Sequence, residues 1–337
     1  MNTQAVKVLF VVNGYPTLEM PEYCIFNKEQ IEALLGTKKV AGEVIFINAQ
    51  DKGKKEYIKS LASIRNSARN CDIVHCFHGL SFIATALVVP DKPIITSFLN
   101  ALAFEYRESP KFDRFLQWIT SYFIKIRHSY AIFKDKVPSN LSCCAFHLPN
   151  GVSTENFNII DRNNAKYQLG LATEKRYVLF VSSKTIHRKQ KRYDRFQKTI
   201  ELLKQVDPSI EELVLVGQPR NLVPLYFNAA SLHIISSDFE GSPNSVKEAL
   251  ACGTPIVSTN VGNVQEMIVG APNCYVVEDF YVKSLFRYSL ESLAKEPDRL
   301  AIRDRIFLNK LDLDTSTSVL IGIYERTIER YGMKGNV

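Results

Sequence analysis

Short apolar runs alternate with longer segments of helical periodicity along most of this chain. Runs typical of buried strands cover 7–13, 42–49, 71–78, 93–99, 176–183, 211–218, 231–238, 254–260 and 274–279, with weaker ones at 130–135 and 142–149. Helical periodicity fits 22–35, 54–69, 80–88, 112–129 and 191–206. Strand, helix and strand repeated this often predict parallel sheets covered by helices on both faces.

The alternation also divides the chain. Its 337 residues are too many for one core. The pattern is interrupted at 147–164, an Asn-rich stretch with a Pro-Asn-Gly turn that is typical of a connection. After residue 285 only helical patterns follow, ending in a stripe of Val319, Ile323, Ile328 and Tyr331. We expect two doubly wound Rossmann-like α/β domains facing a cleft, at 1–150 and 151–315, followed by a structural helix at 316–337.

Composition favours a cytoplasmic protein. No stretch resembles a signal peptide or a membrane span, and the seven scattered cysteines favour a reducing compartment. Residues 1–150 hold 18 Lys and Arg against 13 Asp and Glu. This surplus suits nucleic acid, an anionic membrane, an acidic substrate or an ordinary solvated surface. Segment 115–136 is either a core helix or a basic amphipathic membrane surface, with Trp118, Tyr122, Phe123 and Ile124 among Lys125, Arg127, Lys134 and Lys136.

Several common nucleotide sites are missing from the sequence. The first strand is followed by one lone Gly14 rather than G-x-G-x-x-G, and the strand at 176–183 is followed by no glycine pattern. There is also no P-loop, and no D-x-D pair stands at a strand end to hold a metal. The missing glycine pattern argues against a nicotinamide or flavin enzyme.

The segment SDFEGSPNSVKEALACGTPIVST, residues 237–259, contains the main candidate residues for ligand binding and catalysis. It predicts a strand end, a turn with Glu240, a helix with Ser242 as N-cap and Pro243 as first residue, and a stop at Gly253. The first amides of such a helix suit a phosphate. Glu240 and Glu248 flank this anion site. Since carboxylates accept hydrogen bonds from hydroxyls, a nucleotide sugar, with hydroxyls on both sides of its diphosphate, fits.

The same segment resembles the E-x7-E region of glycosyltransferase family 4, retaining enzymes with the GT-B fold. The match runs over some thirty residues, SDFEGSPNSVKEALACGTPIVSTNVGNVQE. LPNGVSTENF, LVLVGQPRNLVPLYFNAASLHIISS and GYPTLEMPEYCIFNKEQIEAL also resemble family stretches. The chain departs from the family at Tyr23-Cys24, at Leu99 and at 261–263, where Val-Gly-Asn replaces a frequent Gly-Gly pair, mostly on the acceptor side. Members end in a helix that crosses back to the first domain.

The resemblance implies a role for each matched residue. Glu240 would hold the donor sugar and be catalytic, and Glu248 would bind the ribose. The turn at Gly241 and the amides of Ser242, Asn244 and Ser245 would contact sugar and diphosphate. Lys191 matches the family lysine, while its arginine corresponds to Arg188 or is replaced by Lys184. The remaining candidates are Gln218 and Arg220 at the base and, on the acceptor side, His78 and Asn100, with His75 also bordering the cleft.

The resemblance therefore implies a retaining glycosyltransferase of hexosyltransferase type. It would move a sugar from a nucleoside-diphosphate sugar, with UDP favoured over GDP, to a glycan or lipid-linked acceptor in surface polysaccharide biosynthesis. The first domain would bind the acceptor and the second the donor, without cofactor, metal or nucleic acid. The location would be cytoplasmic, with peripheral contact at the inner membrane face left open. The alternatives are a GT-B nucleotide-sugar epimerase or isomerase, and an inactive sugar-nucleotide-binding partner subunit.

Overall fold

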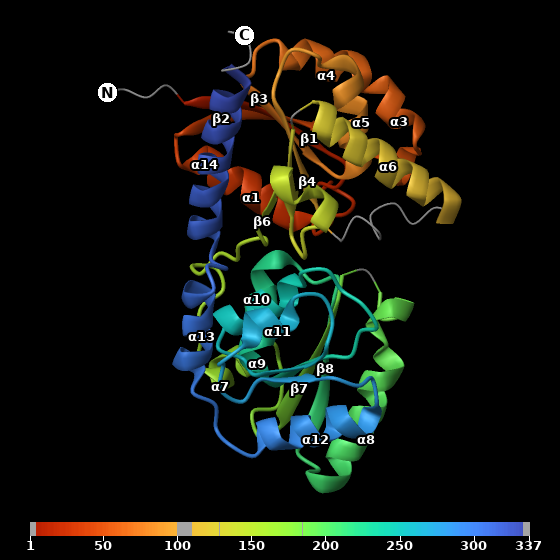
Figure 1. Ribbon diagram of the computed structural model, residues 1–337. Coiled ribbons are helices and arrows are strands. Elements are labelled where there is room, and N and C mark those ends of the chain that lie inside the picture. The colour runs from red at the N-terminus through yellow and green to blue at the C-terminus, as the bar shows by residue number, and fades with distance from the viewer. Residues whose placement is uncertain (1–4, 100–109, 128, 184, 333–337) are drawn as a thin grey trace. The chain divides into compact units, whose positions relative to one another are not determined.

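The computed structural model describes residues 5–99, 110–127, 129–183 and 185–332 (Figure 1). Lys184 and Asn100 lie outside these ranges. The chain forms two compact units: unit 1 is Met1–Asn150 with Asp314–Val337, and unit 2 is Gly151–Leu313. Each unit is built around a parallel sheet with helices on both faces, so the predicted α/β class is confirmed.

The sheet of unit 1 runs in the order β2-β1-β3-β4-β5-β6, with every neighbouring pair parallel. Its central strands are fully buried, which explains their continuous apolar runs. The strands are β1 (Val6–Val12), β2 (Val40–Phe46), β3 (Ile73–Phe77), β4 (Ile94–Phe98), β5 (Tyr130–Phe133) and β6 (Ala145–His147).

Two helical layers cover this sheet. Ile31 and Leu34 of α1 (Ile25–Gly36) pack with Leu320 and Tyr324 of α14 (Leu313–Gly332) on one face. The other face is covered by α4 (Leu61–Ala68), α5 (Gly79–Val88) and α6 (Pro110–Ile126), which contribute Ile64, Phe82, Leu116 and Ile124 among others. Short helices α2 (Ala49–Lys52), α3 (Lys55–Lys59) and η2 (Ser139–Cys144) complete the unit.

Unit 2 repeats the same design. Its parallel sheet runs β11-β10-β9-β7-β8, from β7 (Arg176–Ser182), β8 (Ile210–Val216), β9 (Ala230–Ile235), β10 (Ile256–Thr259) and β11 (Tyr275–Val277). One face carries α8 (Tyr193–Val206) and α12 (Val282–Leu293). The opposite face carries α7 (Arg162–Gln168), α9 (Val223–Ala229), α10 (Asn244–Ala251), α11 (Val264–Ile268) and α13 (Arg299–Leu308).

The strand order gives each unit a topological switch point. Numbered within its own unit, the sheet of unit 1 reads 2-1-3-4-5-6 and that of unit 2 reads 2-1-3-4-5, so in each sheet the chain reverses direction after its second strand. In unit 2 this switch lies between β7 and β9, because β7 leads to α8 on one face and β9 leads to α10 on the other. In open parallel sheets, ligands bind at such a switch point, beyond the carboxyl ends of the strands.

The structure corrects several details of the prediction. The helix expected from 191 begins at Tyr193, after a short 3-10 turn η3 (Lys189–Lys191) and a left-handed Arg192. Val319 is 43% exposed, because the buried stripe of α14 passes through Leu320, Ile323 and Tyr324 instead. Lys134 is buried and adds nothing to the surface charge of unit 1.

His75 was expected to border the ligand cleft, and this is wrong. Its ring lies within the core of unit 1, where Nδ1 contacts the Tyr324 hydroxyl at 2.7 Å and Nε2 contacts the Ser97 hydroxyl at 2.8 Å. Burial holds the pKa of His75 well below its ordinary value. The side chain is thus a neutral link between β3, β4 and α14.

Candidate functional site

Two loops of unit 2 meet at its topological switch point. One is the exit of β7, which reaches η3 and Lys191, and the other is the exit of β9, residues 236–243, which carries Glu240. Lys191 Nζ lies 2.8 Å from Glu240 Oε1, and the Ser237 hydroxyl donates to the same oxygen over 2.7 Å. Both charged side chains are only 12–13% exposed. The carboxylate therefore has a fixed position beside a cation.

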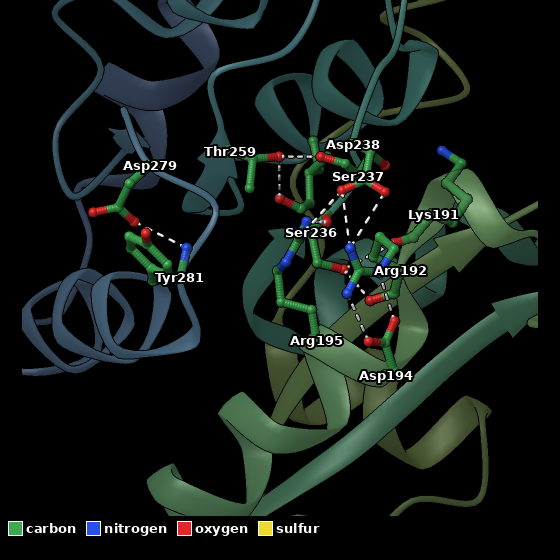
Figure 2. Close-up of polar contacts among 11 residues, drawn as sticks. Lys191, Arg192, Asp194, Arg195, Ser236, Ser237, Asp238, Thr259, Asp279 and Tyr281 are labelled. Atoms are coloured by element: carbon green, nitrogen blue, oxygen red, sulfur yellow. Dashed lines mark hydrogen bonds and ion pairs between the residues drawn. The ribbon is translucent and has the colours of Figure 1, made fainter.

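The loop of Glu240 is braced from both sides. The Ser236 hydroxyl contacts the carbonyl oxygens of Lys191 and Arg192, each at 2.9 Å, and the Asp238 amide donates to the Gln190 carbonyl over 2.8 Å. From β10, the Thr259 hydroxyl donates to the Ser237 carbonyl over 2.7 Å (Figure 2). These bonds hold the two loops in register.

Charge reinforces this bracing. The guanidinium of Arg192 lies between Asp194 at 2.8 Å and Asp238 at 3.2 Å, and Arg195 reaches Asp238 over 2.8 Å (Figure 2). The Arg192 partner lowers the pKa of the Asp194 carboxyl to about 2. Within the basic run at 188–192, Arg192 therefore has a structural role, because Asp194 and Asp238 hold its guanidinium.

A glycine allows a third loop to approach. Gly262 has φ +53°, and a Cβ there would lie 1.8 Å from the Gly241 carbonyl oxygen. The next residue, Asn263, donates its amide to that carbonyl over 3.2 Å. Any larger residue at 262 would displace the turn that carries Glu240.

Helix α10 begins one residue later than expected. Pro243 occupies the N-cap position in extended conformation, so Ser242 is not the cap, and the first helical residue is Asn244. The amides of Asn244 and Ser245 precede the first bond of the helix, which Val246 makes to the Pro243 carbonyl. They form the positive end of the helix, as an anion site requires.

A buried histidine orients Ser245. His233 of β9 contacts the Leu179 carbonyl through Nδ1 at 3.0 Å and the Ser245 hydroxyl through Nε2 at 3.2 Å. Because a carbonyl only accepts, Nδ1 carries the proton and the Ser245 hydroxyl donates to Nε2. Burial lowers the pKa of His233 to about 4, so the ring is neutral at physiological pH.

A lysine is buried in the same helix. Lys247 is 1% exposed, and its Nζ lies 3.3 Å from the Ser242 hydroxyl. Burial lowers its pKa to about 7, with Glu248 acting in the opposite direction. Lys247 lies within one helical turn of Asn244 and Ser245.

Glu248 lies further along α10 and has a different partner. Arg220 Nη1 contacts Glu248 Oε1 at 2.6 Å, and its guanidinium lies 4.6 Å from the centre of the Phe157 ring. Arg220 follows β8 in η4 (Arg220–Leu222), and the half-exposed Gln218 precedes it. The structure thus brings Arg220, predicted for the base, into contact with Glu248, predicted for the ribose.

The remaining candidates are placed apart. Arg188 donates to the Ser183 hydroxyl over 2.8 Å within its own loop. His78 is in unit 1, where it has φ +88° and its Nδ1 accepts from the Leu80 amide over 3.2 Å as the N-cap of α5. The positions of Lys184 and Asn100 lie outside the described residues, so the choice between Lys184 and Arg188 stays open.

Sequence reasoning missed Ser237, His233 and Lys247, and it noted Gly262 only within a departure from the family. The buried lysine had a signal, because Lys247 interrupts the apolar face of a helix between Val246 and Leu250. In the described part of the chain, no three His, Cys, Asp or Glu side chains lie close enough to hold a metal ion. No described helix is both long and apolar enough to span a bilayer.

Comparison with known proteins finds a family model for part of the chain and solved structures of similar fold. Residues 175–294 match the family model for "Glycosyl transferases group 1". They are about a third of the chain and extend from the start of β7 past the end of α12. This segment is therefore similar to group 1 glycosyltransferases, and it contains Lys191, Glu240 and Glu248. Among curated proteins, no match was found.

Solved structures extend the similarity to the whole chain. Sucrose-phosphate synthase from Thermosynechococcus elongatus is 12% identical, with 96% of this chain and 100% of that chain covered and a TM-score of 0.71. Alr3699/HepE from Anabaena, in complex with UDP and glucose, is 13% identical, with 95% and 100% covered and a TM-score of 0.71. A putative UDP-N-acetylglucosamine 2-epimerase from Listeria monocytogenes is 12% identical, with 97% of each chain covered and a TM-score of 0.64. At such identities the likeness shows the fold, which is GT-B.

Proposed function

We propose that this protein is a retaining hexosyltransferase that uses a nucleoside-diphosphate sugar, a UDP-sugar in preference to a GDP-sugar. Its acceptor is a glycan or a lipid-linked glycan of surface polysaccharide biosynthesis. One observation carries the proposal. Glu240, Lys191 and the amino end of α10 lie together at the carboxyl ends of β7 and β9, and Glu248 is part of α10. The group 1 glycosyltransferase match and the UDP and glucose in the HepE structure support this choice.

The departing diphosphate is stabilised by Lys191 and α10. As the bond from the sugar to the diphosphate breaks, its electron pair leaves with the phosphate oxygen, and negative charge grows there. The ammonium of Lys191 has three donors, so it can contact phosphate while it holds Glu240. The amides of Asn244 and Ser245 add fixed positive dipoles, which act on that charge without reorganisation.

The two carboxylates act on different parts of the donor. Glu240 contacts hydroxyls of the sugar, where positive charge develops, and stabilises it. Glu248 accepts hydrogen bonds from the ribose, and Arg220 with Gln218 borders the base. The Arg220–Glu248 ion pair supports this role, because it orients the carboxylate before the ligand arrives.

The protein acts in the cytoplasm, with peripheral contact at the inner face of the membrane. Two points support this location: the surplus of Lys and Arg over Asp and Glu in residues 1–150, and the lipid-linked acceptor that we propose. Unit 1 then binds the acceptor and unit 2 the donor, with His78 and Asn100 on the acceptor side.

A thermal-shift panel of nucleotide sugars tests the proposal directly. A ligand at 100 times its dissociation constant stabilises the protein by about 2.7 kcal/mol. We expect UDP-sugars to raise the melting temperature and GDP-sugars to do so less. The stereochemistry of the product, read by NMR from the anomeric proton, then tests retention. Stabilisation by no nucleotide sugar, or inversion of the anomeric centre, would overturn the corresponding part of the proposal.

An assay without acceptor distinguishes the proposed transferase from the epimerase alternative. The Listeria neighbour shares the fold alone, and an epimerase would convert one nucleotide sugar into another in the absence of any second substrate. A transferase instead leaves the donor intact or hydrolyses it slowly to the nucleoside diphosphate. An inactive subunit would bind the donor and never release its sugar.

A further inference from the structure

The outer face of α6 is apolar although it is exposed. Phe112, Phe115, Trp118, Tyr122 and Ile126 are 46–61% exposed, and they recur at intervals of three and four residues. The opposite face already packs into unit 1 through Leu116, Thr120 and Ile124. Since a helix of a soluble protein normally turns a polar face outward, this second apolar stripe needs an occupant.

The stripe is also preordered. Neighbouring ring centres lie 6.4 Å apart for Phe112 and Phe115, 6.2 Å for Phe115 and Trp118, and 5.7 Å for Trp118 and Tyr122, the last pair stacked at 14°. Helix α6 lies at the surface of unit 1 beside α5 (Figure 1). A continuous row of aromatic rings on one rigid helix presents its surface without ordering new side chains.

Cations flank the aromatic row. A groove of about 640 Å³ runs between α6 and the segment 136–140, with Trp118 and Tyr122 along one wall. Its lining includes the exposed Arg114, Lys125 and Lys136, and no Asp or Glu is among its described lining residues. Within the described chain, none of these three cations has a carboxylate within ion-pair distance.

We propose that the outer face of α6 docks on an anionic lipid bilayer, with the aromatic row in the headgroup region and Arg114, Lys125 and Lys136 on lipid phosphates. Tryptophan and tyrosine favour this interface, and a helix with aromatic residues on one side and cations beside them lies in its plane. The inference deepens the peripheral membrane contact of the proposed function and rests on it, and it names the surface. Charge complementarity selects this occupant, because the described residues that line the groove include cations and no acid.

The chain carries its own reporter for this test. Trp118 is the only tryptophan among the 337 residues, so intrinsic fluorescence reports on the stripe alone. We expect its emission to shift to shorter wavelength when vesicles of phosphatidylglycerol in phosphatidylcholine are added, and to be quenched by brominated lipid chains. Pure phosphatidylcholine vesicles and free glycerol phosphate should leave the emission unchanged.

Two variants separate the contributions of rings and charges. In sedimentation, Phe115→Ala/Trp118→Ala/Tyr122→Ala should lower the partition coefficient about tenfold or more. Arg114→Gln/Lys125→Gln/Lys136→Gln should lower it by about fivefold per cation at low salt, and less at 1 M salt, where the Debye length is about 3 Å. Leu300→Ala/Leu308→Ala on α13, which removes two comparably exposed apolar side chains, is the matched control and should bind like wild type.

UDP binding measured on the same preparations keeps the two proposals apart. Wild-type protein that binds UDP but neither sediments with anionic vesicles nor changes its emission would overturn the docking surface and leave the donor site standing. A blue shift that appears without lipid on concentrating the protein, together with a dimer in ultracentrifugation, would also overturn it in favour of self-association. If the protein bound vesicles but no nucleotide, the proposed glycosyltransferase activity would be contradicted, and the docking surface on α6 would be supported.

Discussion

The two acids of α10 and its preceding loop have different partners, Lys191 for Glu240 and Arg220 for Glu248. We therefore expect different defects. Glu248→Ala should weaken binding of free UDP, which has the ribose but no sugar, by about tenfold or more. Glu240→Gln should leave UDP affinity within a few-fold but lower kcat about 100-fold or more, since it removes charge near the reacting centre. Calorimetric titration with UDP measures the first effect. Equal loss of UDP affinity in both variants would contradict the assignment.

Lys191 should matter for turnover more than its neighbours. Lys191→Ala removes the cation beside Glu240 and the diphosphate site, and we expect kcat to fall by about 100-fold or more, roughly 3 kcal/mol of transition-state stabilisation. Lys189→Ala is the matched control, because Lys189 is exposed two positions earlier in the same 3-10 turn. Similar activity in the two variants would show that Lys191 only supports the loop.

The buried Lys247 predicts a pH dependence of stability. Its pKa is lowered to about 7 in the folded protein, whereas the unfolded chain keeps the proton to about pH 10. Between these values the unfolded state binds more protons, so this group makes the free energy of unfolding rise with pH. Lys247→Met should stabilise the protein by about 1–4 kcal/mol at pH 6.5, and the gain should shrink towards pH 9.5.

Urea unfolding at both pH values measures the effect, and Lys198→Met on the exposed side of α8 is its control. A gain for Lys247→Met that does not change with pH would contradict titration of this amine.

Residue-level prediction succeeded where local sequence sets the position. Glu240 lies in a loop because it follows a strand and precedes Gly241. Glu248 lies in a helix because Pro243 marks the start of that helix. The pairing of Lys191 with Glu240 was not predictable, since it depends on a left-handed Arg192 and on bonds between residues some 45 positions apart. The prediction for His75 was wrong because the local sequence around a histidine near a strand end does not distinguish a side chain that faces a ligand from one that faces the core.

At the scale of elements, α14 completes the core of unit 1. Leu320 is fully buried in it, whereas its neighbour Val319 is 43% exposed. Leu320→Ala should lower the free energy of unfolding by about 2–5 kcal/mol through lost burial and the cavity left behind. Val319→Ala should change it by no more than about 0.5 kcal/mol. Chemical denaturation measures both, and equal costs would mean that α14 does not carry the contact.

Strands were the easiest elements to predict. The central strands of both units are parallel and buried on two faces, so they appear as continuous apolar runs bounded by polar turns. Short helices such as α7 and α9 were missed, because they have seven residues each and too few turns to show a period. The order of the strands, which locates the site between β7 and β9, follows from pairing and not from local sequence.

For the whole molecule, we predict catalysis without a divalent cation. In the proposed site the charge of the departing diphosphate is met by Lys191 and the amino end of α10, which supply the electrostatic stabilisation that a metal gives elsewhere. Donor turnover should be unchanged after dialysis against a chelator. Loss of activity that only Mg²⁺ or Mn²⁺ restores would show that these groups are insufficient.

Unit 1 is assembled from two stretches of chain that are separated by all of unit 2. A ribosome that adds about 5–20 residues per second needs roughly ten to thirty seconds to make the intervening segment. During that time one face of the nascent sheet has no α14 to cover Phe10, Phe77 and Ile132. Unit 2 is continuous and can fold as soon as it emerges. The unit whose translation starts first is therefore the one whose folding finishes last, and its uncovered face is where a chaperone would bind.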